Sequence, residues 1–298
     1  MTGRRVFVTG GSGQLGSAIL DAFADAALIA PSHRALDLGR HEQVAAAIAD
    51  ARPEVIVNCA AFNDVDGAED RPLEAFALNA FAVRSLARAA EQVGATLVHF
   101  STDFVFDGTA REPYREDSAP APRSTYASSK LAGEWFALDA PRAFVLRVES
   151  LFGTPRVWSG RRGSLEAIVA GLEEGREVRV FSDRIVSPGY VRDIAAATRH
   201  LVDAGATAGL YHCVNSGQAT WLAIAEEAAR LLRVEPRLNP VSSAGVTLRA
   251  SRPQYSALDT TKLAAAGFPM PAWQDALRRW LASRDVPSQA AALSGDQP

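Results

Sequence analysis

A glycine-rich stretch near the start of the chain, VTGGSGQLGSAIL at residues 8–20, constrains the fold more than any other feature. Gly11, Gly13 and Gly16 fit the spacing G-x-G-x-x-G, and Gly10 with the last two fits G-x-x-G-x-x-G equally well. The stretch joins a short β-branched run to an Ala- and Leu-rich run. Glycines placed in this way allow a tight turn, close approach of the backbone to a pyrophosphate, and packing of the helix on the strand. We therefore predict a dinucleotide-binding turn at the N-terminus of a helix.

The runs beyond this stretch alternate between two kinds. Short β-branched runs predict strands, and longer Ala- and Leu-rich runs predict helices. Because the short runs are almost wholly apolar, we expect both faces of each strand to be buried, as in a parallel sheet covered by helices on both sides. The expected strands are 5–10, 27–31, 55–60, 96–102 and 143–148, and the expected helices are 17–26, 42–53 and 77–94. This pattern predicts an α/β protein with a doubly wound parallel sheet of the Rossmann type.

The alternation loosens after residue 150, which favours a smaller C-terminal α/β domain that would hold a substrate. The helices expected there are 164–174, 190–205 and 221–233, the strands are 177–181 and 210–215, and 234–258 is expected to be a loop. The predicted division assigns 1–150 and 178–205 to a cofactor-binding domain, 151–177 and 206–285 to a substrate domain, and 286–298 to a tail.

Composition excludes some classes of partner. With 31 Lys and Arg against 34 Asp and Glu, the formal net charge of −3 provides no basic field for nucleic acid. Cys59 and Cys213 lie in apolar runs and indicate free thiols in a reducing compartment. No two of the five histidines share helical ligand spacing, so no metal site is expected. The absence of a signal peptide and of a membrane span predicts a cytoplasmic protein that does not bind membranes.

The residues after the second expected strand bear on which dinucleotide binds. A carboxylate there would bind the ribose 2′-hydroxyl of NAD, but IAPSHRALDL places Ser32 and Arg34 first. Ser32 can donate to a 2′-phosphate and Arg34 can pair with it, which favours NADPH. Asp37 lies about 20 residues after the last glycine, the spacing expected for NAD selection, so NADH remains an alternative.

Tyr126 and Lys130, in RSTYASSKLAGEWF, are four residues apart at the start of an expected helix and so share one face. Ser124 just before them is the expected N-cap. A phenol has a pKa near ~10, and a neighbouring ammonium would lower it. The pair could then serve as a general acid for a carbonyl being reduced. Such a pair is also common on solvated helix faces, so the pattern alone leaves both interpretations open.

The fourth expected strand ends in Ser101 and Thr102, followed by Asp103. In open α/β sheets, ligands bind outside the carboxyl ends of the strands. A hydroxyl there can donate to a carbonyl oxygen as negative charge develops. We expect Thr102 to do so, with Ser101 as the second choice. A hydroxyl that only caps a turn is the alternative.

Four motifs in order, VTGGSGQLG, NCAAFNDVDGAE, STDFVFDG and YASSKLAGE, resemble the extended short-chain dehydrogenase/reductase family, and within it the dTDP-4-dehydrorhamnose reductase group. The segments LRVESLFG, SDRIVSPGYVRDIA, GLYHCVNSGQATW and RPQYSALDTTKL extend the similarity over nearly the whole chain. The resemblance implies reduction, by NAD(P)H, of the 4-keto group of a 6-deoxyhexose carried on dTDP.

The resemblance also implies a role for each matching position. The implied catalytic residues are Thr102, Tyr126 and Lys130, the last of which would also hold the nicotinamide ribose. The implied cofactor-binding residues are Gly10, Gly13, Gln14, Leu15 and Gly16 at the pyrophosphate, Asp37 and Leu38 at the adenine, and Ala60 and Ala61 along the cofactor. The residues expected beside the substrate are Asp103, Phe104, Glu149 and Ser150.

Two departures from the usual motifs of this group concern the sugar. Phe104 stands where STDYVFDG has a tyrosine. LRVESLFG stands where LRTSWVYG is common, which puts Glu149 and Ser150 in place of a Ser-Trp pair. An acidic side chain there adds charge and hydrogen-bond acceptors beside the substrate, so the hexose need not be the rhamnose precursor.

Several arginines are candidates for binding the diphosphate of a nucleotide sugar by bidentate hydrogen bonds. Arg156, Arg161 and Arg162 follow the fifth expected strand, and Arg184 and Arg252 come later. We assign Arg162 and Arg252 to the substrate. Solvated loop charge is the alternative for all of them.

Three classes of function remain open. The first is a sugar nucleotide reductase, and the second is an epimerase or dehydratase on the same scaffold. The third is a non-catalytic NADP-binding protein like the regulatory subunit of methionine adenosyltransferase. Asp103 is followed by Phe104, whereas dehydratases tend to have a second carboxylate there, and the retained Thr102, Tyr126 and Lys130 argue against lost catalysis. The expected partner is a nucleotide-sugar substrate, and a homodimer is left open.

Overall fold

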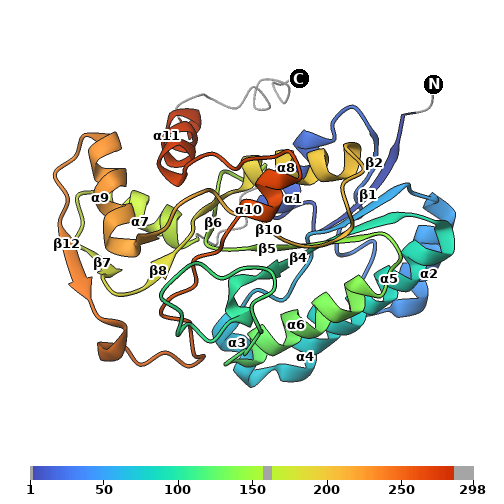
Figure 1. Ribbon diagram of the computed structural model, residues 1–298, viewed down its shortest axis with the longest axis horizontal. Coiled ribbons are helices and arrows are strands. Elements are labelled where there is room, and N and C mark those ends of the chain that lie inside the picture. Colours follow the sequence, from blue (N-terminus) through green and yellow to red (C-terminus); the bar gives the residue numbers. More distant parts are fainter. Residues whose placement is uncertain (1–2, 157–162, 285–298) are drawn as a thin grey trace, which may run out of the picture.

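The computed structural model describes residues 3–156 and 163–284. At its centre is a six-stranded sheet in the order β10-β5-β4-β3-β1-β2, in which all neighbouring strands are parallel (Figure 1). The strands are β1 (Arg5–Thr9), β2 (Ala27–Ile29), β3 (Val55–Asn58), β4 (Thr96–Thr102), β5 (Ala143–Val148) and β10 (Gly209–His212). The predicted parallel sheet is therefore confirmed.

Helices cover both faces of this sheet, as Figure 1 shows. Helices α2, α5 and α6 pack together on one face, and α1 and α8 pack together on the other. Their bounds are α1 (Gln14–Ala22), α2 (His41–Ala51), α5 (Ala82–Val93), α6 (Thr125–Leu138) and α8 (Val191–Asp203). Every residue of β3, β4 and β5 is buried, which explains why these runs do not alternate between apolar and polar residues.

The helix expected over 77–94 is divided at its start. Ala77–Phe81 form a π-helical turn, labelled η1, which follows the short helices α3 (Val65–Asp70) and α4 (Pro72–Phe76) and precedes α5. Asn79 in this turn is buried, and its amide binds both the N–H and the C=O of Phe62 at 2.8 and 3.1 Å. The amide also donates to Ser129 Oγ in α6 at 3.0 Å. Asn79 thus ties the loop after β3 to α6.

A smaller lobe lies at the left of Figure 1. It contains three two-stranded sheets, β7 with β12, β8 with β11, and β6 with β9. The bounds of its elements are β6 (Leu151–Phe152), α7 (Ser164–Glu173), β7 (Val178–Phe181), β8 (Ile185–Val186), β9 (Gly189–Tyr190), β11 (Ala219–Thr220), α9 (Trp221–Leu232), β12 (Leu238–Val241) and α11 (Trp273–Arg284). The short helix α10 (Thr261–Ala265) packs beside β10 at the central sheet instead. Three tryptophans, Trp221, Trp273 and Trp280, contribute to its buried core.

The predicted domain division stays a prediction. The pairing of two strands, β12 and β10, is relevant to it. β7 pairs with β12, and β12 lies inside 234–258, where we expected only loop. Pro240 interrupts the apolar pattern of β12, but a proline is tolerated in an edge strand. β10 pairs with β5 in the central sheet, although the prediction assigns its residues to the substrate domain. The predicted tail, 286–298, lies outside the described residues.

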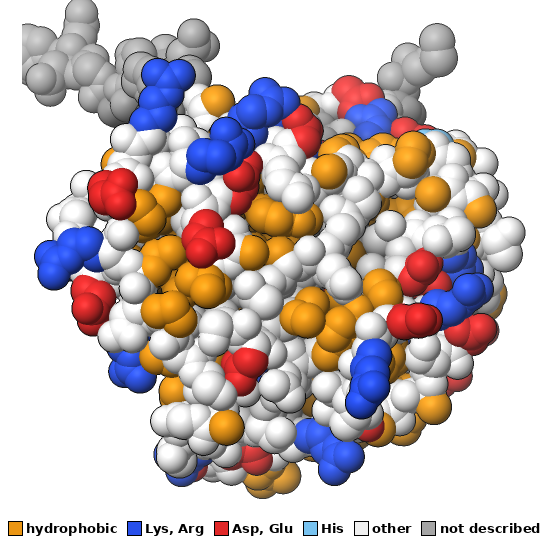
Figure 2. All heavy atoms as spheres, turned by 60° about the vertical axis from the view of Figure 1, so that its left-hand side comes forward, with side chains coloured by type: hydrophobic (Ala, Val, Ile, Leu, Met, Phe, Trp, Pro, Cys, Tyr) orange, Lys and Arg blue, Asp and Glu red, His pale blue; other side chains and the backbone are white. Residues whose placement is uncertain are grey.

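No helix within the described residues is long and apolar enough to span a bilayer. On the face drawn in Figure 2, acidic and basic side chains are scattered among apolar ones instead of gathering by sign. This mixed surface follows from the near balance of 31 basic and 34 acidic residues.

Candidate active site

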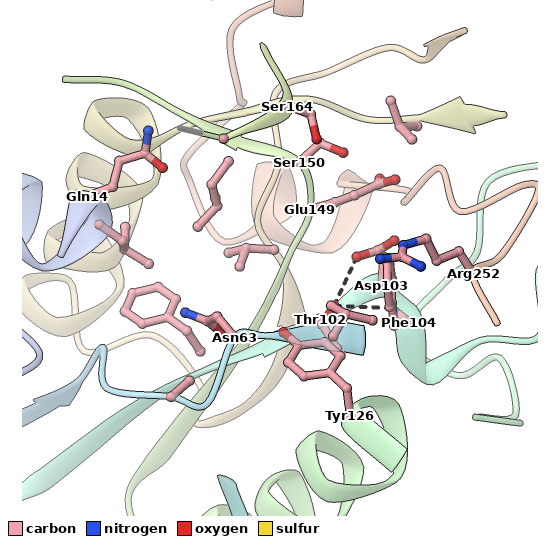
Figure 3. Close-up of a pocket in the computed structure, with 18 of the residues that line it drawn as sticks. Gln14, Asn63, Thr102, Asp103, Phe104, Tyr126, Glu149, Ser150, Ser164 and Arg252 are labelled. Atoms are coloured by element: carbon pink, nitrogen blue, oxygen red, sulfur yellow. Dashed lines mark hydrogen bonds between the residues drawn. The ribbon is translucent and has the colours of Figure 1, made fainter. Parts of the chain in front are cut away.

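A cavity of about 730 Å³ opens at the carboxyl ends of the central strands, where open α/β sheets bind ligands. Its wall combines the glycine turn and the ends of β3, β4 and β5 with β7 and the start of α7, so the cavity lies between the sheet and the smaller lobe (Figure 3). The predicted residues in its lining are Gly13, Gln14, Leu15, Gly16, Ala60, Ala61, Thr102, Asp103, Phe104, Tyr126, Lys130, Glu149, Ser150 and Arg252.

The geometry of the glycine turn shows which of the two spacings, G-x-G-x-x-G or G-x-x-G-x-x-G, describes it. Gly10 has a φ of +67°, and a Cβ there would lie 2.7 Å from the backbone nitrogen of Ala60. A Cβ on Gly16 would lie 2.1 Å from the carbonyl oxygen of Gly10. A Cβ on Gly11 would meet only side-chain atoms, the nearest at 3.2 Å. The wider spacing, with Gly10, Gly13 and Gly16, therefore describes the turn, and the bare backbone that a pyrophosphate requires is present.

The first turn of α1 also fits an anion. Gly13 is the N-cap of this helix and supplies no side-chain hydrogen bond to it, so the first N–H groups face outward with the positive end of the helix dipole. Gln14 donates to the carbonyl oxygen of Gly153 at 2.7 Å and to Glu166 Oε1 at 2.5 Å, and Leu15 is buried in the core. Because these two side chains are engaged within the protein, their contact with a pyrophosphate would come from the main chain.

The residues predicted at the adenine end lie on the loop after β2, outside the lining of the cavity. This loop starts beside the glycine turn, since a Cβ on Gly11 would lie 3.5 Å from Ala30 Cβ. Ser32 and Arg34 are exposed, and Asp37 accepts a hydrogen bond from a backbone N–H two residues on, at 2.9 Å. The side chain of Leu38 is buried in the core beneath α2 and α5, so only its backbone is available to a ligand.

Helix α6 places Tyr126 and Lys130 on the cavity wall. It begins after Ser124, whose Oγ accepts from the N–H of Ala127 at 3.2 Å, so the predicted N-cap is confirmed. Tyr126 and Lys130 are 8% and 3% exposed, which excludes the solvated-face interpretation. The ring of Phe104 packs edge-on against Tyr126 with 5.9 Å between centroids and so fixes the orientation of the phenol.

Thr102, the last residue of β4, lies beside the hydroxyl of Tyr126 (Figure 3). The Thr102 hydroxyl interacts with the phenol and lowers the pKa of Tyr126, against the effect of burial. It also donates to Asp103 Oδ1 at 3.0 Å and accepts from the N–H of Phe104 at 3.2 Å. The structure thus brings together the two hydroxyls that the sequence pointed to. The Ser101 hydroxyl, our second choice, is buried and has no hydrogen-bond partner.

The predicted effect of Lys130 on Tyr126 is wrong. Burial raises the pKa of the Tyr126 phenol, the charge of Asp103 raises this pKa further, and the hydrogen bond with Thr102 opposes the shift only in part. Lys130 Nζ instead donates to the carbonyl oxygen of Phe100 at 2.6 Å, and burial lowers its pKa to about 8. The phenol therefore keeps its proton at neutral pH, as a proton donor must.

Two buried carboxyl groups lie next to these hydroxyls. Asp103 and Glu149 are 3% and 2% exposed, and both line the cavity. Glu149 Oε2 accepts from the N–H of Ser187 at 2.7 Å, and its Oε1 accepts from the hydroxyl of Ser256. Burial raises the pKa of Asp103 to about 6 and raises that of Glu149 well above its usual value. The sequence pointed to both carboxyls but not to the two serines.

The arginines divide into three groups. Arg252 lines the cavity and makes a bidentate ion pair with Asp66 at 2.8 and 2.9 Å. Arg184 also lines the cavity and is 8% exposed, and Arg179 joins them, a residue the sequence analysis did not single out. Arg156 pairs with Asp21 on α1 instead, away from the cavity lining. Arg161 and Arg162 lie outside the described residues.

Three further positions from the sequence analysis are Ser150, Cys59 and Cys213. Ser150 lines the cavity with a φ of +44°, a left-handed conformation that strains a residue with a Cβ. Cys59 is half-buried and Cys213 is buried, and both are free thiols. Within 3–156 and 163–284, no cluster of three or more His, Cys, Asp or Glu is arranged to hold a metal ion.

A doubly wound parallel sheet has a glycine turn at its first helix, a buried threonine at the end of β4, and a buried tyrosine and lysine on α6 beside it. Together these features define the class of extended short-chain dehydrogenases/reductases. A family model described as "RmlD substrate binding domain" matches residues 4–286. The chain therefore belongs to the RmlD family.

Several relatives are similar over almost their full length. A dTDP-4-dehydrorhamnose reductase of Streptomyces griseus is 38% identical over 92% of this chain and 91% of its own. A probable dTDP-4,6-dihydroxy-2-methyloxan-3-one 4-ketoreductase of Streptomyces antibioticus is 37% identical over 92% of this chain and 93% of its own. The crystal structure of a Bacillus anthracis dTDP-4-dehydrorhamnose reductase in complex with NADP superposes with a TM-score of 0.89 at 32% identity, covering 94% of this chain and 99% of that one.

Proposed function

We propose that this protein is an NADPH-dependent reductase of the 4-keto group of a nucleotide-linked 6-deoxyhexose. The observation that carries the proposal is the convergence of the Thr102 and Tyr126 hydroxyls at the wall of a cavity that begins at a dinucleotide-type glycine turn. Relatives with 37% and 38% identity bear names of ketoreductases acting on dTDP-linked substrates, and one relative was solved with NADP.

The site residues divide the reaction between them. A ketone oxygen between Thr102 and Tyr126 would accept a hydrogen bond from each hydroxyl, which stabilises the negative charge that develops on it. Thr102 would have to turn its single proton from Asp103 Oδ1 to the ketone oxygen. The Tyr126 phenol then gives its proton to this oxygen. NADPH, when bound, would supply the hydride for the carbonyl carbon. Lys130, whose Nζ is held at the end of β4 by Phe100, would hold the nicotinamide ribose.

The preference for NADPH over NADH rests on the loop after β2. Ser32 and Arg34 are exposed there, and the Ser32 hydroxyl, whose oxygen accepts from the N–H of Ala35 at 3.3 Å, keeps its own proton to donate to a 2′-phosphate. Asp37 is occupied in part by the backbone N–H that it binds. We assign the nucleotide sugar to the part of the cavity between β7 and Arg252, with Arg162 as a further predicted contact. A cytoplasmic location and a homodimer stay predictions.

The direct test is to incubate the purified protein with NADPH and dTDP-4-keto-6-deoxyhexoses that differ in configuration at C3 and C5. We expect NADPH absorbance to fall and a 4-hydroxy sugar nucleotide to form. NADPH binding without turnover of any of these sugars would instead support the regulatory-subunit alternative.

A further inference from the structure

Helix α3 lies beside the site and packs against α6 (Figure 1). Three of its six residues are acidic, Asp66, Glu69 and Asp70, and none of these three lines the cavity. The helix is capped by Asp64, whose side chain accepts from the N–H of Gly67 at 3.0 Å. Any effect of the three carboxyls on the reaction must therefore pass through the residues that they contact.

The buried face of α3 packs on Tyr126. Ala68 is buried and forms one apolar cluster with Ala75 and the ring of Tyr126. Phe104, which lies edge-on to the same ring, is partly buried against this cluster. The ring that carries the phenol is therefore packed against α3 as well as against Phe104.

Glu69 holds the residue that precedes Tyr126. Its Oε1 accepts from the N–H of Thr125 at 2.8 Å, and its Oε2 accepts from the Thr125 hydroxyl at 2.9 Å. Thr125 is the first residue of α6, so its N–H has no partner within that helix. A carboxylate there is also stabilised by the positive end of the helix dipole. Glu69 thus fixes both the backbone and the side chain at the position before the phenol.

Asp66 makes a similar contact at the other end of α3. Its carboxylate forms the bidentate pair with Arg252, and its Oδ1 also accepts from the N–H of Ala250 at 3.0 Å. The hydrogen bond with Arg252 is the main reason why the pKa of Asp66 is lowered to about 2, so this pair is charged at neutral pH. Ala250 is buried, and Arg252 lines the cavity. Asp66 therefore holds a cavity-lining arginine from a distant segment of the chain.

The third carboxyl of α3 shows what an ordinary surface pair is like. Asp70 and Arg249 pair with 43% and 62% of their side chains exposed, and neither lines the cavity. Exposed pairs of this kind contribute little. Arg252 is only 18% exposed in its pair with Asp66, and Glu69 is half-buried against a backbone N–H. Only the contacts of Asp66 and Glu69 reach residues at the site.

We propose that Glu69 and Asp66 are positioning residues of the reductase, which act on the two parts of the site that α3 connects. Glu69 places the Tyr126 phenol against the ketone oxygen by holding the start of α6. Asp66 places Arg252 for the nucleotide sugar by holding the segment 250–252. Because both carboxylates belong to one helix of six residues, the proton donor and the substrate contact are kept at a fixed separation. The inference rests on the proposed function, in which Tyr126 gives the proton and Arg252 contacts the nucleotide sugar.

The two carboxylates predict different kinetic effects. Glu69→Ala removes both acceptors of Thr125. Because a misplacement of 1 Å can cost about 100-fold in rate, we expect kcat for ketone reduction to fall about 10- to 100-fold, with KM for the nucleotide sugar within about twofold. Asp66→Asn keeps the side-chain size but removes the charge that holds Arg252, so we expect KM to rise about tenfold and kcat to stay within about threefold. A loss of folded protein would instead lower kcat in both variants.

A double-mutant cycle tests the contact between Glu69 and Thr125. Thr125→Val loses the hydroxyl and should lower kcat, whereas the conservative Thr125→Ser should keep more of it. In the Glu69→Ala background, Thr125→Val should have little further effect, because the partner of the hydroxyl is already absent. Glu74→Gln changes a carboxyl of α4 that pairs with Arg71 at the surface, and it is the matched control with wild-type kcat and KM. Thermal melting verifies that each variant is folded.

A measurement without turnover separates this inference from the reductase proposal. In protein labelled with 3-fluorotyrosine, the fluorine resonance of Tyr126 is identified among those of the five tyrosines by its absence in Tyr126→Phe. Glu69→Ala and Glu69→Gln should shift this resonance, because the ring moves relative to Asp103 and Phe104. Glu74→Gln should leave it unchanged.

Each result decides one of the two proposals. If the wild-type protein reduces the ketone, a folded Glu69→Ala protein with wild-type kcat and an unshifted resonance would overturn the role of Glu69, and a wild-type KM in Asp66→Asn would overturn that of Asp66; the reductase would stand in both cases. If the wild-type protein reduces no ketone, the reductase proposal falls, and the resonance alone decides whether Glu69 places the phenol. If Glu69→Ala does not fold, Glu69→Gln and Thr125→Val decide in the same way.

Discussion

Replacement of Tyr126 by phenylalanine removes a single oxygen atom from the centre of the site. The ring is 8% exposed and packs edge-on against Phe104 at 5.9 Å between centroids, and both features persist in Tyr126→Phe. The proton donor, one hydrogen bond to the ketone oxygen and the interaction of the phenol with Thr102 are lost. The variant therefore isolates the chemical role of the phenol from its packing role.

The expected loss of turnover follows from the loss of the proton donor and of the hydrogen bond to the ketone oxygen. A positioned general acid contributes about 10²–10⁴-fold to a rate, which corresponds to about 2.7–5.5 kcal/mol of barrier. Thr102 keeps its place at the end of β4 and still donates to the oxygen, so some electrostatic stabilisation remains. We expect kcat for ketone reduction to fall by about 10³-fold, while Kd for NADPH changes less than about threefold.

The assay compares kcat from NADPH absorbance with Kd from quenching of protein fluorescence, for the wild type, Tyr126→Phe and Thr102→Val. Thr102→Val should lose about 10²-fold in kcat, because one donor to the oxyanion is removed. The double variant should lose less than the product of the two single losses, because both hydroxyls act on one oxygen. A kcat within tenfold of the wild type in Tyr126→Phe would refute the assignment of the phenol as the acid.

Three further predictions concern the cofactor, the core and pH. Arg34→Ala should raise KM for NADPH at least tenfold more than KM for NADH, since only the former has a 2′-phosphate; equal increases in steady-state assays would contradict the NADPH preference. Glu134→Gln leaves Arg147 buried beside a neutral group, with both of its bonds at 2.7 and 2.8 Å weakened, and urea unfolding should show a loss of about 3–5 kcal/mol. Asp103 has a folded pKa of about 6, above its ordinary 3.8, so the folded state binds the proton more tightly and the associated stability is lost as pH rises through that range. Asp103→Asn should therefore gain stability relative to the wild type between pH 4 and pH 7, and no change in that difference would refute the raised pKa.

The sequence predicted the central sheet because its inner strands β3, β4 and β5 are buried on both faces and so have no polar alternation. The outer strands β2 and β10 are only partly buried, so the expectation of full burial is wrong for them. It did not predict β12, because the run around Pro240 has the composition of a loop and becomes a strand only by pairing with β7. The π-helical turn was also missed, since it depends on the bonds of Asn79 to Phe62 and Ser129, which are distant in sequence. The local sequence pattern therefore determines the strands whose own residues form the buried core. Contacts with distant segments determine β12 and the π-helical turn.

The same distinction applies to the site. Tyr126 and Thr102 could be identified because each stands at the end of a predictable element. The raised pKa of Tyr126 could not be predicted, because it depends on burial and on the charge of Asp103. The spacing of residues along one helix reveals neither of these. The link from Glu149 to Ser187 and Ser256 required three segments to meet.

Register in the parallel sheet explains how a substrate contact can change without a change in the catalytic hydroxyls. Because Thr102 and Val148 are partners, Asp103 and Glu149 are the next residues on neighbouring strands, and both line the cavity. A change at position 149 can therefore alter the polar groups that a substrate meets without moving either hydroxyl. A serine at that position would leave Asp103 as the lone carboxylate of this pair, whereas Glu149 adds a second carboxyl. In this arrangement, Glu149→Ser should retain ketone reduction and change KM for the nucleotide sugar more than kcat.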